Sequence, residues 1–148
     1  MVPDHYLKLD SQFCFPIYAL SREITQLYRQ FLDQLDITYP QYLVLMVLWQ
    51  HDKQTVNQLG DKLLLDSGTL TPLLKRLEQK ALVNRNRSKA DERVVEISLT
   101  VAGAKLKEQA SCIPREMFDL LGISLEEMET LKSIAHKILQ YNAREQKG

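Results

Sequence analysis

The sequence has little cysteine, no long hydrophobic run and no net charge. Only Cys14 and Cys112 are present among 148 residues, which excludes a framework of structural disulfides and a zinc site with four clustered ligands. No apolar run approaches the roughly 20 residues that span a bilayer, and the first residues, MVPDHYLKLD, lack the apolar segment of a signal peptide. We therefore expect a cytoplasmic protein that does not enter a membrane.

The formal net charge is zero, so total charge does not indicate a nucleic-acid partner, but the local distribution is uneven. Residues 75–93 hold seven basic side chains against three acidic ones, whereas acids gather elsewhere, for example at Glu126, Glu127 and Glu129. A balanced chain with one basic segment fits a DNA-binding protein whose other surfaces have different tasks.

Apolar spacing predicts two helices in the first third of the chain. Residues 11–33 carry apolar side chains at steps of four and three, a heptad-like seam typical of a helix that packs against another helix. Residues 40–51 are apolar on nearly all sides, which predicts a buried central helix. The seam of the first helix consists of Phe13, Ile17, Leu20, Ile24, Leu27 and Phe31.

The middle of the chain predicts a helix-turn-helix unit followed by a β-hairpin. Thr55 and Gln58 have the spacing of a capping box that opens a helix to residue 63, and residues 66–69 break the pattern before another helix that reaches residue 80. After Ala81 the period changes, and residues 82–87 and 94–99 alternate as strands. The polar residues 88–92 form the tip of this hairpin, so the sequence predicts a mainly α protein with a small β-hairpin wing.

The remaining residues predict helices that a monomer cannot cover. Thr100 caps a fifth helix at 101–121 with a kink at Pro114, and Ser124 opens a last helix to residue 142. Pairing with a second copy would bury their apolar stripes and those of the first helix. We therefore expect a single chain, 1–148, that forms a homodimer through residues 11–34 and 101–143. Residues 40–99 would be the winged helix-turn-helix, with two reading helices about one DNA turn apart.

The predicted DNA contacts lie in the fourth helix and the wing. Small or hydrogen-bonding side chains at the start of a reading helix suit base edges, and basic side chains suit phosphates or a narrow minor groove. Among them, Asp91 is expected to hold the guanidinium of Arg93 by a bidentate contact. The helix supplies Ser67, Gly68, Thr69, Thr71, Pro72, Lys75 and Arg76, and the wing supplies Arg85, Arg87, Lys89, Asp91 and Arg93.

These segments resemble a known family. The wing string Asp91-Glu-Arg93, followed by Leu99-Thr100, is similar to the D-x-R…L-T signature of MarR regulators. The segments CFPIYALSRE, LDITYPQYLVL and LDSGTLTPLLKRLE resemble the organic hydroperoxide resistance regulators of that family, strongly over residues 12–100. The resemblance implies a dimeric repressor without metal or cofactor, which binds pseudo-palindromic double-stranded DNA and releases it when an organic hydroperoxide oxidises Cys14.

The position of Cys14 agrees with that chemistry. At the start of the first helix, the backbone N–H groups favour a thiolate, and Tyr18, one turn later, can reach the sulfur with its hydroxyl. Tyr28 lies about 21 Å further along the same helix, so it can meet only the Cys14 of a partner whose first helix runs antiparallel. The resemblance assigns Tyr28 and Tyr39 to hydrogen bonds with the reactive cysteine.

The role of Cys112 and two other functions stay open at this stage. Some relatives resolve the oxidised cysteine with a second cysteine of the partner, and others use a small cellular thiol. One alternative is a MarR-type regulator of a small aromatic ligand, with Cys14 incidental. Another is a thiol peroxidase, although a single predicted hairpin does not provide the α/β scaffold of such an enzyme.

Overall fold

The computed structural model describes residues 4–146, and the chain divides between residues 112 and 113 into two compact units. Helices predominate, and the strands form one small antiparallel sheet, in agreement with the predicted fold class. None of the helices in the described range is long and apolar enough to cross a membrane.

The first unit opens with two short 3-10 helices, η1 (Asp4–Leu7) and η2 (Leu9–Ser11), before the long helix α1 (Cys14–Leu32). The predicted start of α1 at residue 11 is wrong by three residues, because Gln12 is extended and its N–H closes η2 on the carbonyl of Leu9. After α1, η3 (Asp33–Leu35) ends at Asp36, which has left-handed backbone angles. Cys14 is therefore the first residue of α1.

Capping side chains fix the starts of the next three helices. Thr38 caps α2 (Tyr39–Gln50) and Thr55 caps α3 (Val56–Leu63), each in a complete capping box. Asp66 caps α4 (Ser67–Gln79) by accepting a hydrogen bond from the N–H of Thr69 at 2.6 Å. The predicted helix-turn-helix is therefore present as α3 and α4, and α2 is the predicted buried helix.

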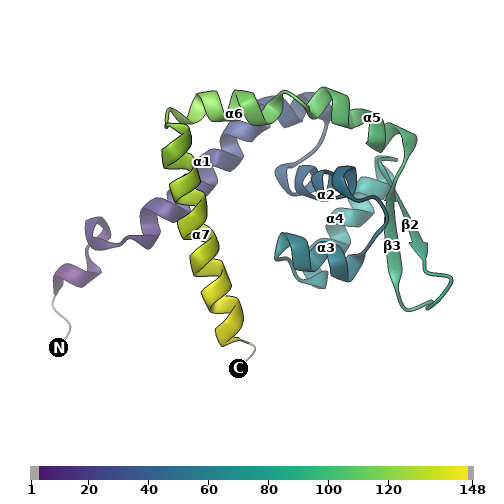
Figure 1. Cartoon of the computed structure of the whole chain (residues 1–148), viewed down its shortest axis with the longest axis horizontal. Helices are drawn as coiled ribbons and strands as arrows, with labels where there is room; N and C mark the ends of the chain where they lie inside the picture. The colour runs from purple at the N-terminus through teal and green to yellow at the C-terminus, as the bar shows by residue number, and fades with distance from the viewer. Residues whose placement is uncertain (1–3, 147–148) are drawn as a thin grey trace. The chain divides into compact units, whose positions relative to one another are not determined.

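The sheet contains three strands in the order β1-β3-β2. β2 (Val83–Arg87) and β3 (Val95–Leu99) form the predicted hairpin, with Arg85 opposite Ile97. β1 (Gln54–Thr55) pairs with the other edge of β3 and was not predicted, because two residues carry no alternation to detect. In Figure 1 the hairpin stands beside α2, α3 and α4.

The core of the first unit joins these helices to the hairpin. Its members are almost fully inaccessible aliphatic side chains, each at most 2% exposed, and they lie in every helix from α2 to α4 and in both long strands. Because this core holds α4 against α2 and the sheet, α4 is a fixed part of the unit. Among the largest are Leu45, Leu48, Leu59, Leu70, Leu74, Leu77 and Ile97, with Val44 and Val83 beside them and Leu32 from the end of α1.

The predicted fifth helix is wrong as a continuous element. It consists of α5 (Val101–Ala110), which closes the first unit apart from a two-residue turn, and α6 (Ile113–Leu121), which opens the second. Pro114 explains the break, because its ring clashes with the carbonyl four residues earlier, which belongs to Ala110. The last helix, α7 (Leu125–Glu145), begins at the predicted capping box of Ser124 and ends three residues beyond the prediction.

Candidate DNA interface and thiol site

The start of α4 presents the residues predicted to read DNA. Ser67, Gly68, Thr69 and Pro72 are exposed and Thr71 is half-buried, while Leu70 and Leu74 on the opposite face enter the core. Lys75 and Arg76 are also exposed. Hydrogen bonds from the N–H and hydroxyl of Thr69 lower the pKa of Asp66, so this carboxylate stays ionised as the helix cap.

The wing shows its predicted basic residues in two different settings. Arg87, Lys89 and Arg93 are exposed and free to meet phosphates. Arg85 instead turns back to α4, where its Nη1 lies 3.4 Å from Oε2 of Glu78 and its Nε is buried without a partner. Arg85 therefore connects the wing to α4 through an ion pair, a role that the sequence did not predict for it.

Asp91 organises the wing tip, although not in the predicted way. Its Oδ1 accepts a hydrogen bond from the backbone N–H of Arg93 at 3.0 Å and lies 3.9 Å from Nε of the same residue. The predicted bidentate contact is wrong, because the structure shows one long contact between Oδ1 and Nε in place of two short ones, and the Arg93 side chain is 94% exposed. The guanidinium of Arg93 stays available for DNA.

A hollow of about 240 Å³ joins the two predicted DNA-reading parts to the start of α3. Thr71 of α4 and Arg93 of the wing line it together with Thr55 and Asn57 at the start of α3. Its hydroxyl, amide and guanidinium groups suit a backbone phosphate. Thr55 and Asn57 were missed as candidate DNA contacts, since the sequence shows Thr55 only as a helix cap.

Cys14 and Tyr18 lie in the exposed first turns of α1. The Phe13 position before the helix makes no side-chain cap, and the first turn contains no acid, so the backbone N–H groups near Cys14 are unopposed by negative charge. The ring of Tyr18 lies 5.5 Å below the guanidinium of Arg22. No hydrogen bond joins Cys14 to Tyr18 within residues 4–146, so the predicted contact is not formed in the single chain.

Tyr28 and Tyr39 meet at the other end of α1. Their ring centroids are 4.5 Å apart, and Tyr42 lies 5.8 Å from Tyr28. The array continues to Trp49, 6.1 Å from Tyr42, whose indole N–H donates to the carbonyl of Gly103 at 2.9 Å. The sequence predicted Tyr28 and Tyr39 but not Tyr42, which reads there only as part of a buried helix.

Burial keeps these tyrosine hydroxyls protonated. It raises the pKa of Tyr28 to about 12, with a further contribution from the neighbouring Tyr39 and Tyr42. Burial also raises the pKa of Tyr39. Protonated hydroxyls are hydrogen-bond donors, and donors are what a thiolate accepts from. Both hydroxyls can therefore act as donors to an anionic group.

Cys112 lies next to the same array. It is exposed in the turn after α5. Burial is the main cause that raises the pKa of Tyr42, and the charges of Tyr39 and Cys112 add to it. Cys112 thus lies near Tyr42, whose ring is 5.8 Å from that of Tyr28, whereas Cys14 lies at the far end of α1, which is continuous over 19 residues.

Comparison with known proteins identifies the family. The family model described as "Transcriptional regulator SarA/Rot" matches residues 26–110. The organic hydroperoxide resistance transcriptional regulator of Bacillus subtilis (strain 168) is 53% identical over 137 residues, 93% of this chain and 92% of the relative. This chain belongs to the MarR/SarA family of transcriptional regulators. The resemblance drawn from the wing and the first helix is confirmed, and the peroxidase alternative does not fit a family of regulators.

Solved structures of this family agree with the fold of the regulator. The structure of reduced AbfR bound to DNA has a TM-score of 0.75 and 36% identity, over 95% of this chain and 98% of that one. The structure of disulfide-formed AbfR has a TM-score of 0.64 and 38% identity, over 91% and 96%. AbfR comes from Staphylococcus epidermidis. The predicted winged helix-turn-helix is therefore confirmed, while the individual site residues remain predictions.

Proposed function

We propose that this regulator is a homodimeric repressor that senses organic hydroperoxides through Cys14 and then releases a pseudo-palindromic operator. The observation that carries the proposal is the division of the sensing residues between the two ends of α1. Cys14 and Tyr18 lie at one end, and Tyr28 and Tyr39 meet at the other. Two antiparallel copies of α1 would bring the ends together and complete the site twice.

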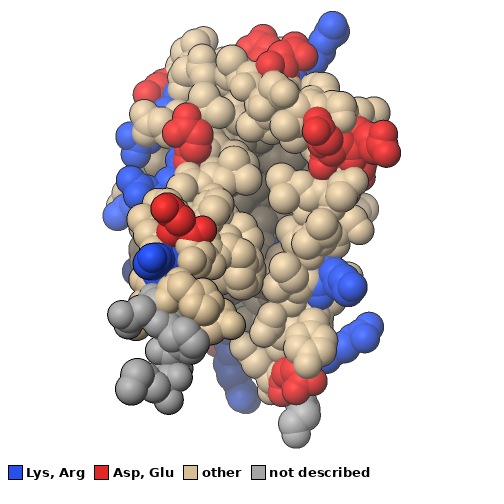
Figure 2. Space-filling model, turned by 90° about the vertical axis from the view of Figure 1, so that its left-hand side faces the viewer, with Lys and Arg blue, Asp and Glu red and all other residues tan. Residues whose placement is uncertain are grey.

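Uncovered apolar stripes support the dimer. Phe13 just before α1, and Ile17 and Leu20 within it, are 72%, 53% and 38% exposed, although they belong to the predicted heptad seam. On α7, Leu131, Ile134 and Ile138 follow helical spacing and are each about half exposed. Uncharged side chains cover broad areas of the face in Figure 2, between separate charged groups. Apolar helix faces of this length are normally buried by another helix.

The chemistry begins with a thiolate at Cys14. The sulfur attacks the distal peroxide oxygen, the O–O bond breaks, and the products are a sulfenic acid and an alkoxide that takes a proton to become an alcohol. A second thiolate then attacks the sulfenic sulfur, forms a disulfide and releases hydroxide, which becomes water on protonation. The place of Cys112 near Tyr42 favours the partner subunit's Cys112 as this thiol, and a small cellular thiol is the other source.

Oxidation would weaken DNA binding by changing the dimer. The sulfenic acid or disulfide no longer accepts the tyrosine hydrogen bonds as a thiolate does, so α1 moves relative to the partner and the two copies of α4 lose their spacing of about one DNA turn. A coupling free energy of only about 3–4 kcal/mol lowers the affinity several hundred-fold.

A gel-shift titration with operator-like DNA, with and without an organic hydroperoxide, tests the proposal. We expect the reduced wild type and Cys14→Ser to bind alike, and peroxide to release only the wild type. Cys112→Ser should lose intersubunit disulfide, seen on non-reducing gels, if Cys112 resolves the sulfenic acid. Release of Cys14→Ser by peroxide would refute the proposed sensor, and release of wild type by an aromatic ligand alone would support the alternative regulator.

A further inference from the structure

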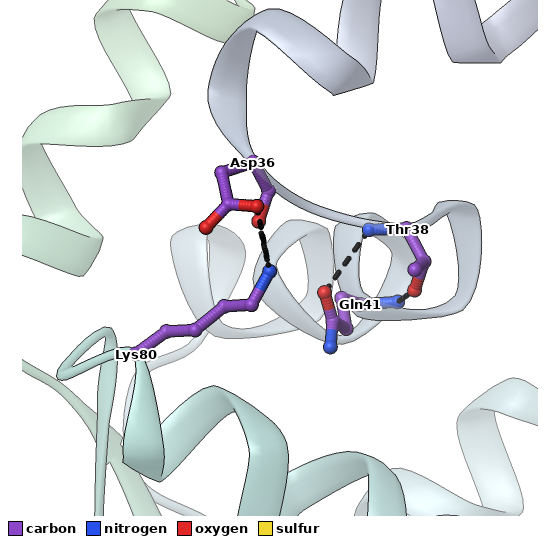
Figure 3. Close-up of polar contacts among 4 residues, drawn as sticks. All are labelled: Asp36, Thr38, Gln41 and Lys80. Carbon is purple, nitrogen blue, oxygen red and sulfur yellow. Dashed lines mark hydrogen bonds and ion pairs between the residues drawn. The ribbon is translucent and has the colours of Figure 1, made fainter.

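A lysine at the end of the reading helix reaches across to the turn between α1 and α2. The Nζ of Lys80 lies 3.2 Å from Oδ1 of Asp36 and also donates to the backbone carbonyl of Asp36. Figure 3 shows the extended side chain pointing from the end of α4 into this turn. The two residues are 44 positions apart in the sequence, so the contact ties together elements that the chain does not join directly.

Both ends of the contact sit at fixed backbone corners. Asp36 ends η3 with φ 53°, a left-handed conformation, and Thr38 caps α2 two residues later. Lys80 is the cap residue of α4, and Ala81 after it has φ 57°. A shift of the turn is therefore passed to the lysine side chain rather than absorbed by a flexible backbone.

The turn is also the joint between the two halves of the tyrosine pair. Tyr28 lies on α1 before it, and Tyr39 is the first residue of α2 after it. Any event that moves α1 relative to α2 must displace residues 33–38. The ion pair of Glu78 with Arg85 holds α4 to the wing. A displacement of Lys80 therefore moves the reading helix and the wing together.

We infer that Lys80 is a positioning residue that couples the α1–α2 turn to the reading helix. Through its contact with Asp36, Lys80 transmits to α4 the movement of α1 that follows oxidation of Cys14. This inference rests on the proposed function, because it needs a signal that arrives at α1. It adds a route within one chain to the change of spacing between the two copies.

The test compares how strongly oxidation lowers DNA affinity in variants of the full chain. The quantity is the ratio of Kd after organic hydroperoxide to Kd in the reduced state, which cancels charge effects common to both states. We expect Lys80→Met to lower this ratio about two- to five-fold, the range of an exposed ion pair worth up to about 1 kcal/mol. Asp36→Asn should lower it less, since the backbone carbonyl remains, and the double variant should equal Lys80→Met.

Two controls separate coupling from other effects. Lys132→Met removes a comparable surface ion pair, with Glu129 at 3.8 Å inside α7, and should leave the ratio unchanged. Lys80→Arg should keep most of the wild-type ratio of oxidised to reduced Kd. If Lys80 instead contacts a DNA phosphate, Lys80→Met should reduce the slope of log Kd against log salt concentration by about one and leave the ratio of Kd values unchanged. This result would overturn the inference.

The outcomes also distinguish the two proposals. A wild-type ratio of one refutes peroxide sensing, and with it the coupling. A wild-type ratio well above one, together with the same ratio in Lys80→Met, refutes only the coupling. An equal fall in Lys132→Met would show a general effect of surface charge and would likewise refute it.

Discussion

Gly103 lies where α5 passes closest to the root of the wing, and replacing it by alanine should destabilise the first unit. A Cβ there would lie 2.0 Å from the carbonyl oxygen of Leu82 and 3.3 Å from Cδ2 of Leu99. The nearest atom is backbone, and the N–H of Thr100 donates to the same carbonyl at 3.1 Å. Neither the backbone at Gly103 nor the carbonyl of Leu82 can shift at a low energetic cost, so α5 must move away from β2.

The magnitude follows from three contributions. Overpacking costs about 1–3 kcal/mol, and displacement of Gly103 weakens the bond from Trp49, worth about 1 kcal/mol. The better helix propensity of alanine returns about 1 kcal/mol. A net loss of about 1–3 kcal/mol lowers Tm by roughly 2–12 °C in a chain of this length.

Thermal unfolding followed by circular dichroism measures this loss, and the fluorescence of Trp49, the only tryptophan, reports the local change. Gly68→Ala is the matched control, because its Cβ meets only a side-chain oxygen of exposed Asp66 at 3.3 Å. A Gly103→Ala protein as stable as wild type would show that the close approach of α5 to Leu82 is not as described.

Further predictions concern the tyrosines and the wing. The pKa of Tyr28 is raised to about 12, so the protonated hydroxyl contributes its full stability below pH 10, and this contribution is lost as pH rises toward 12. The urea midpoint should therefore fall more steeply between pH 10 and 12 in wild type than in Tyr28→Phe. Equal slopes in the two proteins would contradict the raised pKa. Arg87→Ala should weaken DNA binding and reduce the salt slope by about one, measured by fluorescence anisotropy at several salt concentrations. Arg85→Met should instead lower Tm with little change in the salt slope, and the reverse pattern would show that Arg85 contacts phosphate.

Local patterns were enough to predict most of the fold. Capping residues such as Thr55, Asp66 and Ser124 mark helix starts through contacts that span three residues, so the sequence contains the whole interaction. The change of period after Ala81 marks the hairpin for the same reason. Pro114 predicts a disturbance of the helix, but the sequence does not distinguish a kink from a break, because a proline clash does not reveal whether the chain resumes the same helix.

The sites depended on contacts that sequence spacing does not carry. Arg85 reads as one more basic residue until Glu78 is seen beside it, and Lys80 has no visible relation to Asp36. Tyr42 looks like core in an apolar helix, yet it joins Tyr28 and Tyr39 to Trp49. The distance between Cys14 and Tyr28 along one helix was the exception, since helical rise alone shows that they cannot meet in one chain.

Mixed dimers of Cys14→Ser and Tyr28→Phe chains test most directly whether two subunits build the sensing site. In such a dimer, the one remaining Cys14 faces an intact Tyr28 only if the tyrosine comes from the other chain. We predict that its thiol reacts with an organic hydroperoxide at the wild-type rate per thiol, faster than in the Tyr28→Phe homodimer. A rate equal to that of the Tyr28→Phe homodimer would contradict a site shared between subunits.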